Sequence, residues 1–128
     1  MAVPYITVQR VNPGDPDAPK KTYAIAKSRG ELTFRQLAKE IAQGSTTVSD
    51  SDMLAVLNDL TKLLRRHLEN GEIVRFGDFG TFRIGLSSEG AESEEAFHFS
   101  MIKKQKVVFT PGIELKEMLL TMKFEKHE

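Results

Sequence analysis

The chain has 128 residues, of which 40% are hydrophobic and 28% charged, and 18 basic residues balance 18 acidic residues to a formal net charge of +0. This composition fits a globular domain with a modest core and excludes a disordered or membrane-embedded chain. The lack of cysteine excludes disulfides and thiolate metal sites, and the balanced charge means that any polyanion must bind a local basic patch.

The N-terminal region predicts a β-hairpin. Residues Tyr5–Val11 and Lys20–Lys27 are rich in β-branched and aromatic side chains, which favour strands. The intervening Asn12–Pro19 holds three of the five prolines and predicts a loop. We therefore expect residues 1–31 to form a hairpin extension and residues 32–128 to form the main domain. A signal-peptide pattern is absent, and so is an apolar run of membrane-spanning length, so we expect no membrane association.

Two helices are predicted next. Thr33 and Gln36 form a capping box before an apolar face at helical spacing, and this helix is expected to end near Gly44. After a short link over Ser45–Val48, Ser49 begins a second capping box, and its helix is expected to run to about Glu69. Asn70-Gly71 is a natural helix stop.

The second helix is apolar over more than one face. A helix of this kind has to be covered on more than one side, which two short helices and a thin sheet cannot do within a monomer. We therefore expect this helix to lie in a dimer interface. Its apolar positions are Met53, Leu54, Val56, Leu57, Leu60, Leu63, Leu64 and Leu68.

The stretch Ile73–Ile84, IVRFGDFGTFRI, is predicted to be a single bent strand. Most of its apolar residues alternate as in a strand, but Phe79 lies three residues before Phe82, which in a regular strand would put the rings on opposite faces. Gly77 and Gly80 flank Phe79, so a bulge or sharp bend is expected to turn both rings into one core.

The C-terminal third predicts a β-arm followed by a helix. Ser87–Ala96 is acidic and lacks basic residues, which indicates a flexible tip, and Phe97–Phe109 is predicted to return as a strand. Thr110-Pro111 is predicted to begin the last helix. The order strand, strand, helix, helix, strand, strand, helix indicates an α+β fold with a small antiparallel sheet.

From Leu32 onward the chain resembles the bacterial histone-like HU/integration host factor family. The resemblance rests on the helical hairpin, on FGDFGTF (Phe76–Phe82) after Asn70-Gly71-Glu72, on a long β-hairpin, and on VVFTPG (Val107–Gly112) opening a helix. The N-terminal hairpin lies outside the usual family pattern and is similar to HU-like variants of the Bacteroidetes type.

The resemblance implies an intertwined homodimer whose protruding β-arms embrace double-stranded DNA with little sequence preference. The dimer-core residues would be Leu57, Leu60, Leu64, Phe79, Phe82 and Phe109. The DNA-binding residues would be Arg75, Arg83, Lys103, Lys104 and Lys106.

The arm tip departs from the family pattern. The family tip is typically basic with an intercalating proline, whereas this tip carries Glu89, Glu92, Glu94 and Glu95 and no proline. Carboxylates there would repel phosphates. Lys103, Lys104 and Lys106 are therefore the best candidates for phosphate contact. The alternative is a solvated strand edge whose lysines discourage aggregation.

No pattern indicates an enzyme. His67 is not accompanied by a nucleophile motif, and a lone helical histidine is usually structural. The spacing of the tip glutamates lacks the ligand pattern of a calcium loop, and we expect neither a metal nor another cofactor.

The sequence thus predicts a non-catalytic, largely sequence-nonspecific, nucleoid-associated DNA-binding dimer in the cytoplasm. The alternative is a protein-interaction or scaffold module of the same fold that has lost most DNA affinity. Its protein partner would bind the N-terminal hairpin or the acidic tip.

Overall fold

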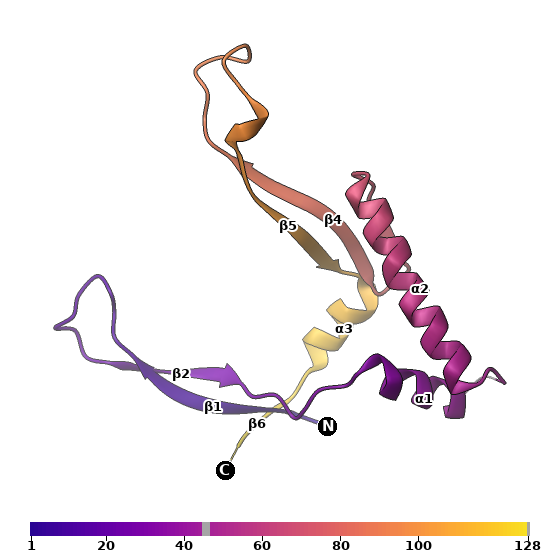
Figure 1. The fold of residues 1–128 in the computed structure, drawn as a ribbon. Coiled ribbons are helices and arrows are strands. Elements are labelled where there is room, and N and C mark those ends of the chain that lie inside the picture. The colour runs from indigo at the N-terminus through magenta and orange to yellow at the C-terminus, as the bar shows by residue number, and fades with distance from the viewer. Residues whose placement is uncertain (45–46, 128) are drawn as a thin grey trace. The chain divides into compact units, whose positions relative to one another are not determined.

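The computed structural model describes residues 1–44 and 47–127, and the chain divides into two compact units. The first, the sheet unit, consists of residues 1–33 and 119–128. The second, the arm unit, is Phe34–Met118 (Figure 1). Of the expected link Ser45–Val48, residues 45 and 46 lie outside the described part of the chain.

The sheet unit is a three-stranded sheet in the order β2-β1-β6. Strands β1 (Val3–Arg10) and β2 (Lys21–Ala26) pair antiparallel, as the sequence predicts. The loop between them is closed by local bonds, such as the one that the Asn12 side-chain oxygen accepts from the Gly14 N–H at 2.9 Å. The sequence did not predict β6 (Phe124–Lys126), which pairs parallel with the other side of β1.

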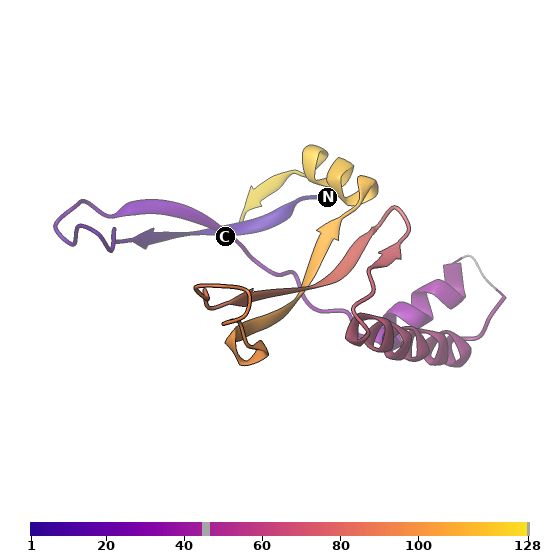
Figure 2. The ribbon, with the colours of Figure 1, turned by 90° about the horizontal axis from the view of Figure 1, so that it is seen from above.

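Helices α1 (Phe34–Gly44) and α2 (Asp50–Glu69) match the predicted hairpin and lie side by side (Figure 2). The Ser49 hydroxyl accepts a 3.2 Å hydrogen bond from the Asp52 N–H and so caps α2. Gly71 has a φ of +83° and donates its N–H to the Leu68 carbonyl at 2.9 Å. The predicted helix stop at Asn70-Gly71 is thereby confirmed.

The expectation of one bent strand over Ile73–Ile84 is wrong. The stretch forms two antiparallel strands, β3 (Val74–Phe76) and β4 (Gly80–Ser88), joined by a tight turn. Gly77 has a φ of +56°, which a residue with a Cβ rarely adopts, and the Phe79 N–H bonds the Phe76 carbonyl at 3.2 Å. The two glycines therefore reverse the chain instead of bending it.

Strand β5 (Ile102–Pro111) pairs antiparallel with β4 to form the arm. The predicted strand start at Phe97 is wrong, because Phe99–Met101 form a 3₁₀ helix whose Ser100 N–H is capped by the His98 ring at 3.2 Å. The predicted helix start is also wrong. Pro111 ends β5, and α3 (Ile113–Thr121) begins two residues later.

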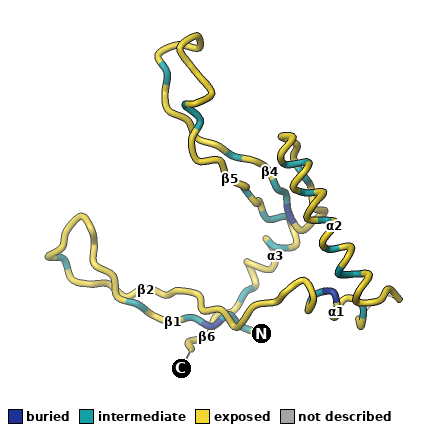
Figure 3. The backbone as a smooth tube through the Cα atoms, in the orientation of Figure 1, coloured by how far each residue is buried: buried dark blue, intermediate teal, exposed yellow. Residues whose placement is uncertain are grey.

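Little of the chain is buried (Figure 3). Among the described residues only Pro4, Ala38 and Gly80 are buried, and Ala38, with 1% exposure, is the one side chain of a buried hydrophobic core. A soluble domain of this length normally buries well over half of its unfolded surface. The exposed apolar faces of this chain therefore need a second protein surface to cover them.

Candidate functional site

The sheet β3-β4-β5 has one apolar face and one polar face. Residues directly opposite each other in an antiparallel pair share a face. Phe82 opposes Val74 on one side and Phe109 on the other, and these residues build the apolar face. On the other face, Arg75 opposes Thr81.

That polar face continues along the arm. Arg83 opposes Val108, and Lys106 opposes Gly85 two residues further on. The carbon stem of Lys106 lies over Gly85, which leaves it room. Three basic residues, Arg75, Arg83 and Lys106, therefore share one face.

A β-bulge adds Lys103 to this face. After the Gly85–Lys106 pair the register shifts, and the next pair is Ser87 with Lys103. Had the register continued, Ser87 would oppose Lys104, and Lys103 would lie on the other face. The extra residue falls in β5, where Lys104 has a φ of 50°, the one positive φ outside glycine in the described chain.

We call Arg75, Arg83, Lys103 and Lys106 the basic face. All four side chains are exposed. Among the paired residues that the structure describes, this face holds no carboxylate, because the others are Thr81, Gly85, Ser87, Val108 and Thr110. Strand β5 is an edge strand, so the same lysines also suit the role of discouraging edge pairing.

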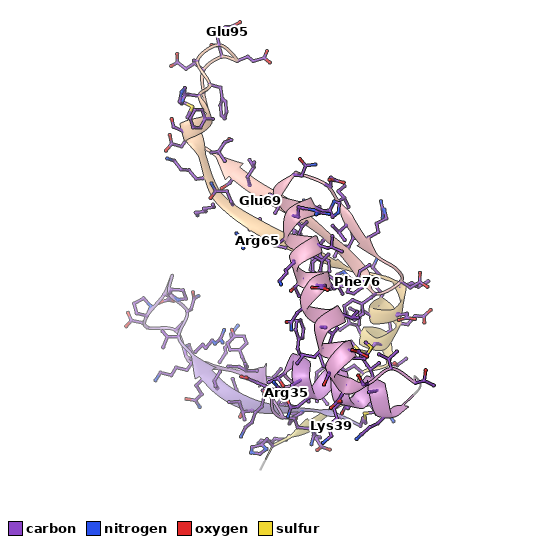
Figure 4. All side chains as sticks on the ribbon, turned by 45° about the vertical axis from the view of Figure 1, so that its right-hand side comes forward. Arg35, Lys39, Arg65, Glu69, Phe76 and Glu95 are labelled. Carbon is purple, nitrogen blue, oxygen red and sulfur yellow. The ribbon has the colours of Figure 1, made fainter. Side chains whose placement is uncertain are left out.

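The arm tip has the opposite charge. Glu89 lies 3.9 Å from the Lys103 ammonium in an ion pair whose side chains are both more than half exposed, so it adds little stability. Figure 4 shows Glu95 at the end of the arm, away from Arg65 and Glu69 on α2. The tip thus competes with any anion for Lys103.

Four phenylalanines form a cluster on the apolar side. The ring centroids of Phe82 and Phe109 are 4.9 Å apart, and those of Phe79 and Phe109 are 5.7 Å apart. Phe76 lies 5.9 Å from Phe79 and 6.3 Å from Phe82. The turn after Gly77, and not a bulge, brings Phe79 and Phe82 into one cluster.

The residues expected in the dimer core are not buried within one chain. Phe79 is 45% exposed and Phe109 36% exposed, and Leu57, Leu60, Leu64 and Phe82 are half-buried. An open apolar groove of about 470 Å³ runs between α2 and the arm strands. Its apolar lining consists of Leu64, Leu68, Phe82, Ile84 and Val107.

His67 is engaged at the end of α2. Its Nδ1 lies 3.2 Å from a Glu72 carboxylate oxygen, which also accepts a 2.8 Å hydrogen bond from the Asn70 amide. The Asn70 hydrogen bond, followed by that of His67, lowers the pKa of Glu72. His67 therefore contacts Glu72 at the C-terminal end of α2, which is a structural role.

The described residues also bear on two other classes of function, metal binding and membrane insertion. Within residues 1–44 and 47–127, His, Asp and Glu side chains do not gather in threes that could hold a metal ion. In the same residues, none of the helices is long and apolar enough to cross a membrane.

The family model HU-HIG, described as an HU domain fused to a wHTH, Ig or glycine-rich motif, matches residues 1–126. Two solved structures are similar. One is a protein from Bacteroides vulgatus ATCC 8482 assigned to DNA binding, with a TM-score of 0.66 and 13% identity over 98% of this chain. This chain spans about half, 48%, of that protein.

The second similar structure is Anabaena HU crystallised with DNA, with a TM-score of 0.54 and 17% identity. The likeness covers 70% of this chain and 99% of the Anabaena chain. At these identities the likeness shows the fold, which is α+β and HU-like. Among curated proteins no match was found.

Proposed function

The chain belongs to the HU-HIG family, and from this premise we propose that it is a non-catalytic architectural protein that binds double-stranded DNA as a homodimer. It contacts the phosphate backbone through the basic face and reads little sequence. Such a protein acts on the nucleoid, in the cytoplasm. The Anabaena structure, an HU–DNA complex of the same fold, supports the choice of DNA.

The observation that carries this proposal is the bulge at Lys104. It places Lys103 beside Lys106, Arg83 and Arg75 on one face of the sheet, where paired carboxylates are absent among the described residues. Exposed lysines and arginines on a strand surface suit phosphate oxygens, and each phosphate that they neutralise releases counterions. Contacts of this kind position a protein on DNA without reading its bases.

The open apolar surface supports a homodimer. Leu57, Leu60 and Leu64 are half-buried, and the groove between α2 and the arm strands is open to solvent. A second copy that fills this groove would bury the phenylalanine cluster as well. Burial of this surface contributes about 25 cal/mol per Å². The dimer is therefore the state in which we expect the fold to be stable.

The acidic tip lowers the expected affinity. Four glutamates on the arm reduce the net positive potential that DNA meets, and Glu89 already pairs with Lys103. We therefore expect weaker binding than for a protein with a basic tip.

A salt titration with the full-length chain tests the proposal. Fluorescence anisotropy with two labelled duplexes of unrelated sequence should give similar affinities that fall steeply as salt rises from about 50 to 200 mM. Light scattering on the same samples should give the mass of a dimer. Absence of binding at about 50 mM salt, or an affinity that ignores salt, contradicts the proposal.

The alternative function is a protein-interaction module of the same fold. The observation in its favour is the acidic tip beside the exposed Phe99, which is 76% exposed. The triple variant K103E/K104E/K106E separates the two functions. Loss of DNA binding supports the DNA-binding protein, whereas unchanged DNA retention favours the interaction module.

A further inference from the structure

Strand β2 is an open edge of the sheet unit. In the described part of the chain, β2 pairs with β1 alone, on one of its two sides. The pairing runs over six residues without a register shift, and β2 contains no proline. Strand β5, by contrast, is distorted by the bulge at Lys104, and bulges of this kind protect sheet edges from pairing. Strand β2 is therefore a regular edge to which another strand can add.

The backbone of β2 has unused hydrogen-bonding groups. The Lys27 N–H bonds the Pro4 carbonyl at 2.8 Å, so the backbone groups of Lys27 point toward β1. Because this direction alternates from residue to residue, the N–H and C=O groups of Thr22, Ala24 and Ala26 point away from β1. Within the described residues these outward groups have no partner. They are placed to bond the main chain of an added strand.

One face of β2 has a cation at each end and apolar residues between them. The residues that share this face are Lys21, Tyr23, Ile25 and Lys27. Tyr23 is 47% exposed and Ile25 is 37% exposed. At the rise of an extended strand, the two lysine positions lie about 20 Å apart. An added strand would meet a lysine, two apolar side chains and a second lysine in turn.

The Lys21 end of this face is basic. The Arg10 guanidinium lies over the Tyr23 ring, 6.0 Å from its centroid, and adds a second cation beside Lys21. Asp15 and Asp17 follow in the loop, but in the described part of the chain they form no ion pair with either cation. This end is therefore open to a carboxylate from another molecule.

At the other end, Lys27 has one acidic neighbour on its face. Glu125 shares this face, because both residues oppose Pro4 from its two sides. The Glu125 carboxylate, however, lies 3.5 Å from the Arg29 guanidinium, which also donates a 2.7 Å hydrogen bond to the Ala2 carbonyl. Glu125 is thus already engaged by Arg29, and Lys27 lies at the strand edge without an ion pair of its own among the described residues.

A second copy of β2 fits this edge poorly. In the antiparallel register with the greatest overlap, Ala24 of one copy would oppose Ala24 of the other. That register sets Lys21 of each copy opposite Lys27 of the other, and like charges directly opposite are destabilising. The lysines therefore discourage pairing between copies, and the same charges attract a strand with carboxylates at these positions.

We propose that β2 binds an extended segment of a partner protein by strand addition. The segment carries a carboxylate at its first and seventh positions and apolar side chains at its third and fifth positions. The positions between them lie beside Thr22, Ala24 and Ala26, whose small side chains leave room for most residues. The pattern is the same in both directions, so it fits a parallel or an antiparallel strand. This interaction does not depend on DNA binding.

Two peptides test the proposed pattern on the full-length chain. The first is acetyl-ETVTVTE-amide, and the second is its charge-reversed counterpart, acetyl-KTVTVTK-amide. In NMR titrations to millimolar concentration, the first peptide should shift the backbone amides of Thr22, Ala24 and Ala26, because these N–H groups bond the added strand. The second peptide should leave them in place. The amide of Lys103 on the arm serves as a reference that neither peptide should shift.

The variant Ala24→Pro tests whether the edge itself is the binding site. Proline removes the outward N–H of Ala24 and leaves the hydrogen bonds to β1 intact, so it is tolerated at a strand edge. We expect the affinity for the first peptide to fall about tenfold, the cost of a lost hydrogen bond and a steric block. Ala24→Ser is the matched control, because it keeps the N–H, and it should bind as the wild type does. Circular dichroism checks that both variants fold.

A charge reversal gives a second test that does not depend on the folding of Ala24→Pro. The double variant K21E/K27E should lose the first peptide and bind the second. The control K62E/K126E makes the same charge change away from this face, since Lys62 is on α2 and Lys126 is on the other face of the sheet unit. It should keep the wild-type preference.

Several outcomes would overturn the proposal. These are unshifted β2 amides at millimolar concentration of the first peptide, equal binding of the two peptides, and an unchanged preference in K21E/K27E. An unchanged affinity in folded Ala24→Pro would also overturn it. If light scattering shows an assembly of the wild-type chain that Ala24→Pro dissociates, the edge binds a second copy and the proposal is likewise wrong.

Discussion

The Gly112 N–H donates a 2.8 Å hydrogen bond to the carbonyl of Phe79, and the Glu114 N–H bonds the neighbouring Asp78 carbonyl at 3.2 Å. The turn between β3 and β4 thus satisfies N–H groups at the start of α3. The two sequence motifs that carry the family resemblance, FGTF and FTPG, meet at this point. The two motifs lie about thirty residues apart in the sequence, but the hydrogen bond between Gly112 and Phe79 joins them directly.

This contact predicts that Gly112→Ala destabilises the fold. A Cβ at Gly112 would overlap the Asp78 carbonyl, and the Gly80 nitrogen would be 3.0 Å away, so the turn would have to shift. We expect a loss of about 1–3 kcal/mol in the free energy of unfolding, measured with urea at fixed protein concentration. Gly90→Ala is the matched control, because a Cβ there meets nothing within 4 Å. Equal midpoints for the two variants would contradict the account.

A matched pair of substitutions at Lys104 tests the role of the bulge. Lys104→Gly and Lys104→Val remove the same charge, but only glycine adopts a φ near 50° without strain, whereas a β-branched residue there is strongly disfavoured. We expect Lys104→Val to bind DNA several-fold more weakly than Lys104→Gly, because the strained variant shifts Lys103 off the basic face. Equal affinities by anisotropy would show that the bulge does not matter.

The acidic tip should reduce DNA affinity. Replacing Glu89, Glu92, Glu94 and Glu95 by glutamine removes repulsion of phosphates and releases Lys103 from its ion pair with Glu89. We expect affinity to rise several-fold at about 50 mM salt and the gain to shrink at high salt, where exposed charges are screened. An affinity that stays the same or falls at low salt would mean that the tip contacts DNA in another way.

Glu72 should titrate below its ordinary pKa of 4.5, chiefly because it accepts a hydrogen bond from Asn70. Because the pKa of Glu72 is lowered in the folded state, its carboxylate stabilises the fold at any pH above the ordinary pKa of 4.5. This stabilisation is lost as the pH falls through the lower pKa of the folded state. Asn70→Ala should move the pKa of Glu72 back toward 4.5, as followed by NMR of the carboxyl carbon. A pKa that does not change would remove Asn70 as the cause.

Helices α1 and α2 could be predicted because their ends are coded locally. Ser49 caps α2 and Gly71 stops it, and both signals depend on residues within one turn. Besides the starts of β5 and α3, three features could not be read in this way: β6, the turn in FGDFG and the bulge at Lys104. Phe124–Lys126 pairs with Val3–Tyr5 across almost the whole chain, and three residues carry too little pattern to reveal a strand.

The turn in FGDFG and the bulge at Lys104 both concern backbone direction. FGDFG was expected to bend a strand because Phe79 broke the alternation, but a glycine on each side also permits a full reversal, and that occurred. The positive φ of Lys104 has no counterpart in the sequence, since lysine does not favour it. Arg75, Arg83 and Lys106 share a face by simple alternation once the register is known, whereas Lys103 joins them only through the bulge.

The most direct test of the account is the salt dependence of DNA binding by the double variant K103Q/K106Q. These two lysines belong to the basic face, and the exposed Lys39 on α1 and Lys62 on α2 provide a control, K39Q/K62Q, with the same loss of charge. Across about 50–200 mM salt, K103Q/K106Q should show a log K against log salt slope smaller by about 2, and the control should match the wild type. A wild-type slope for K103Q/K106Q would contradict the claim that the basic face binds the DNA backbone.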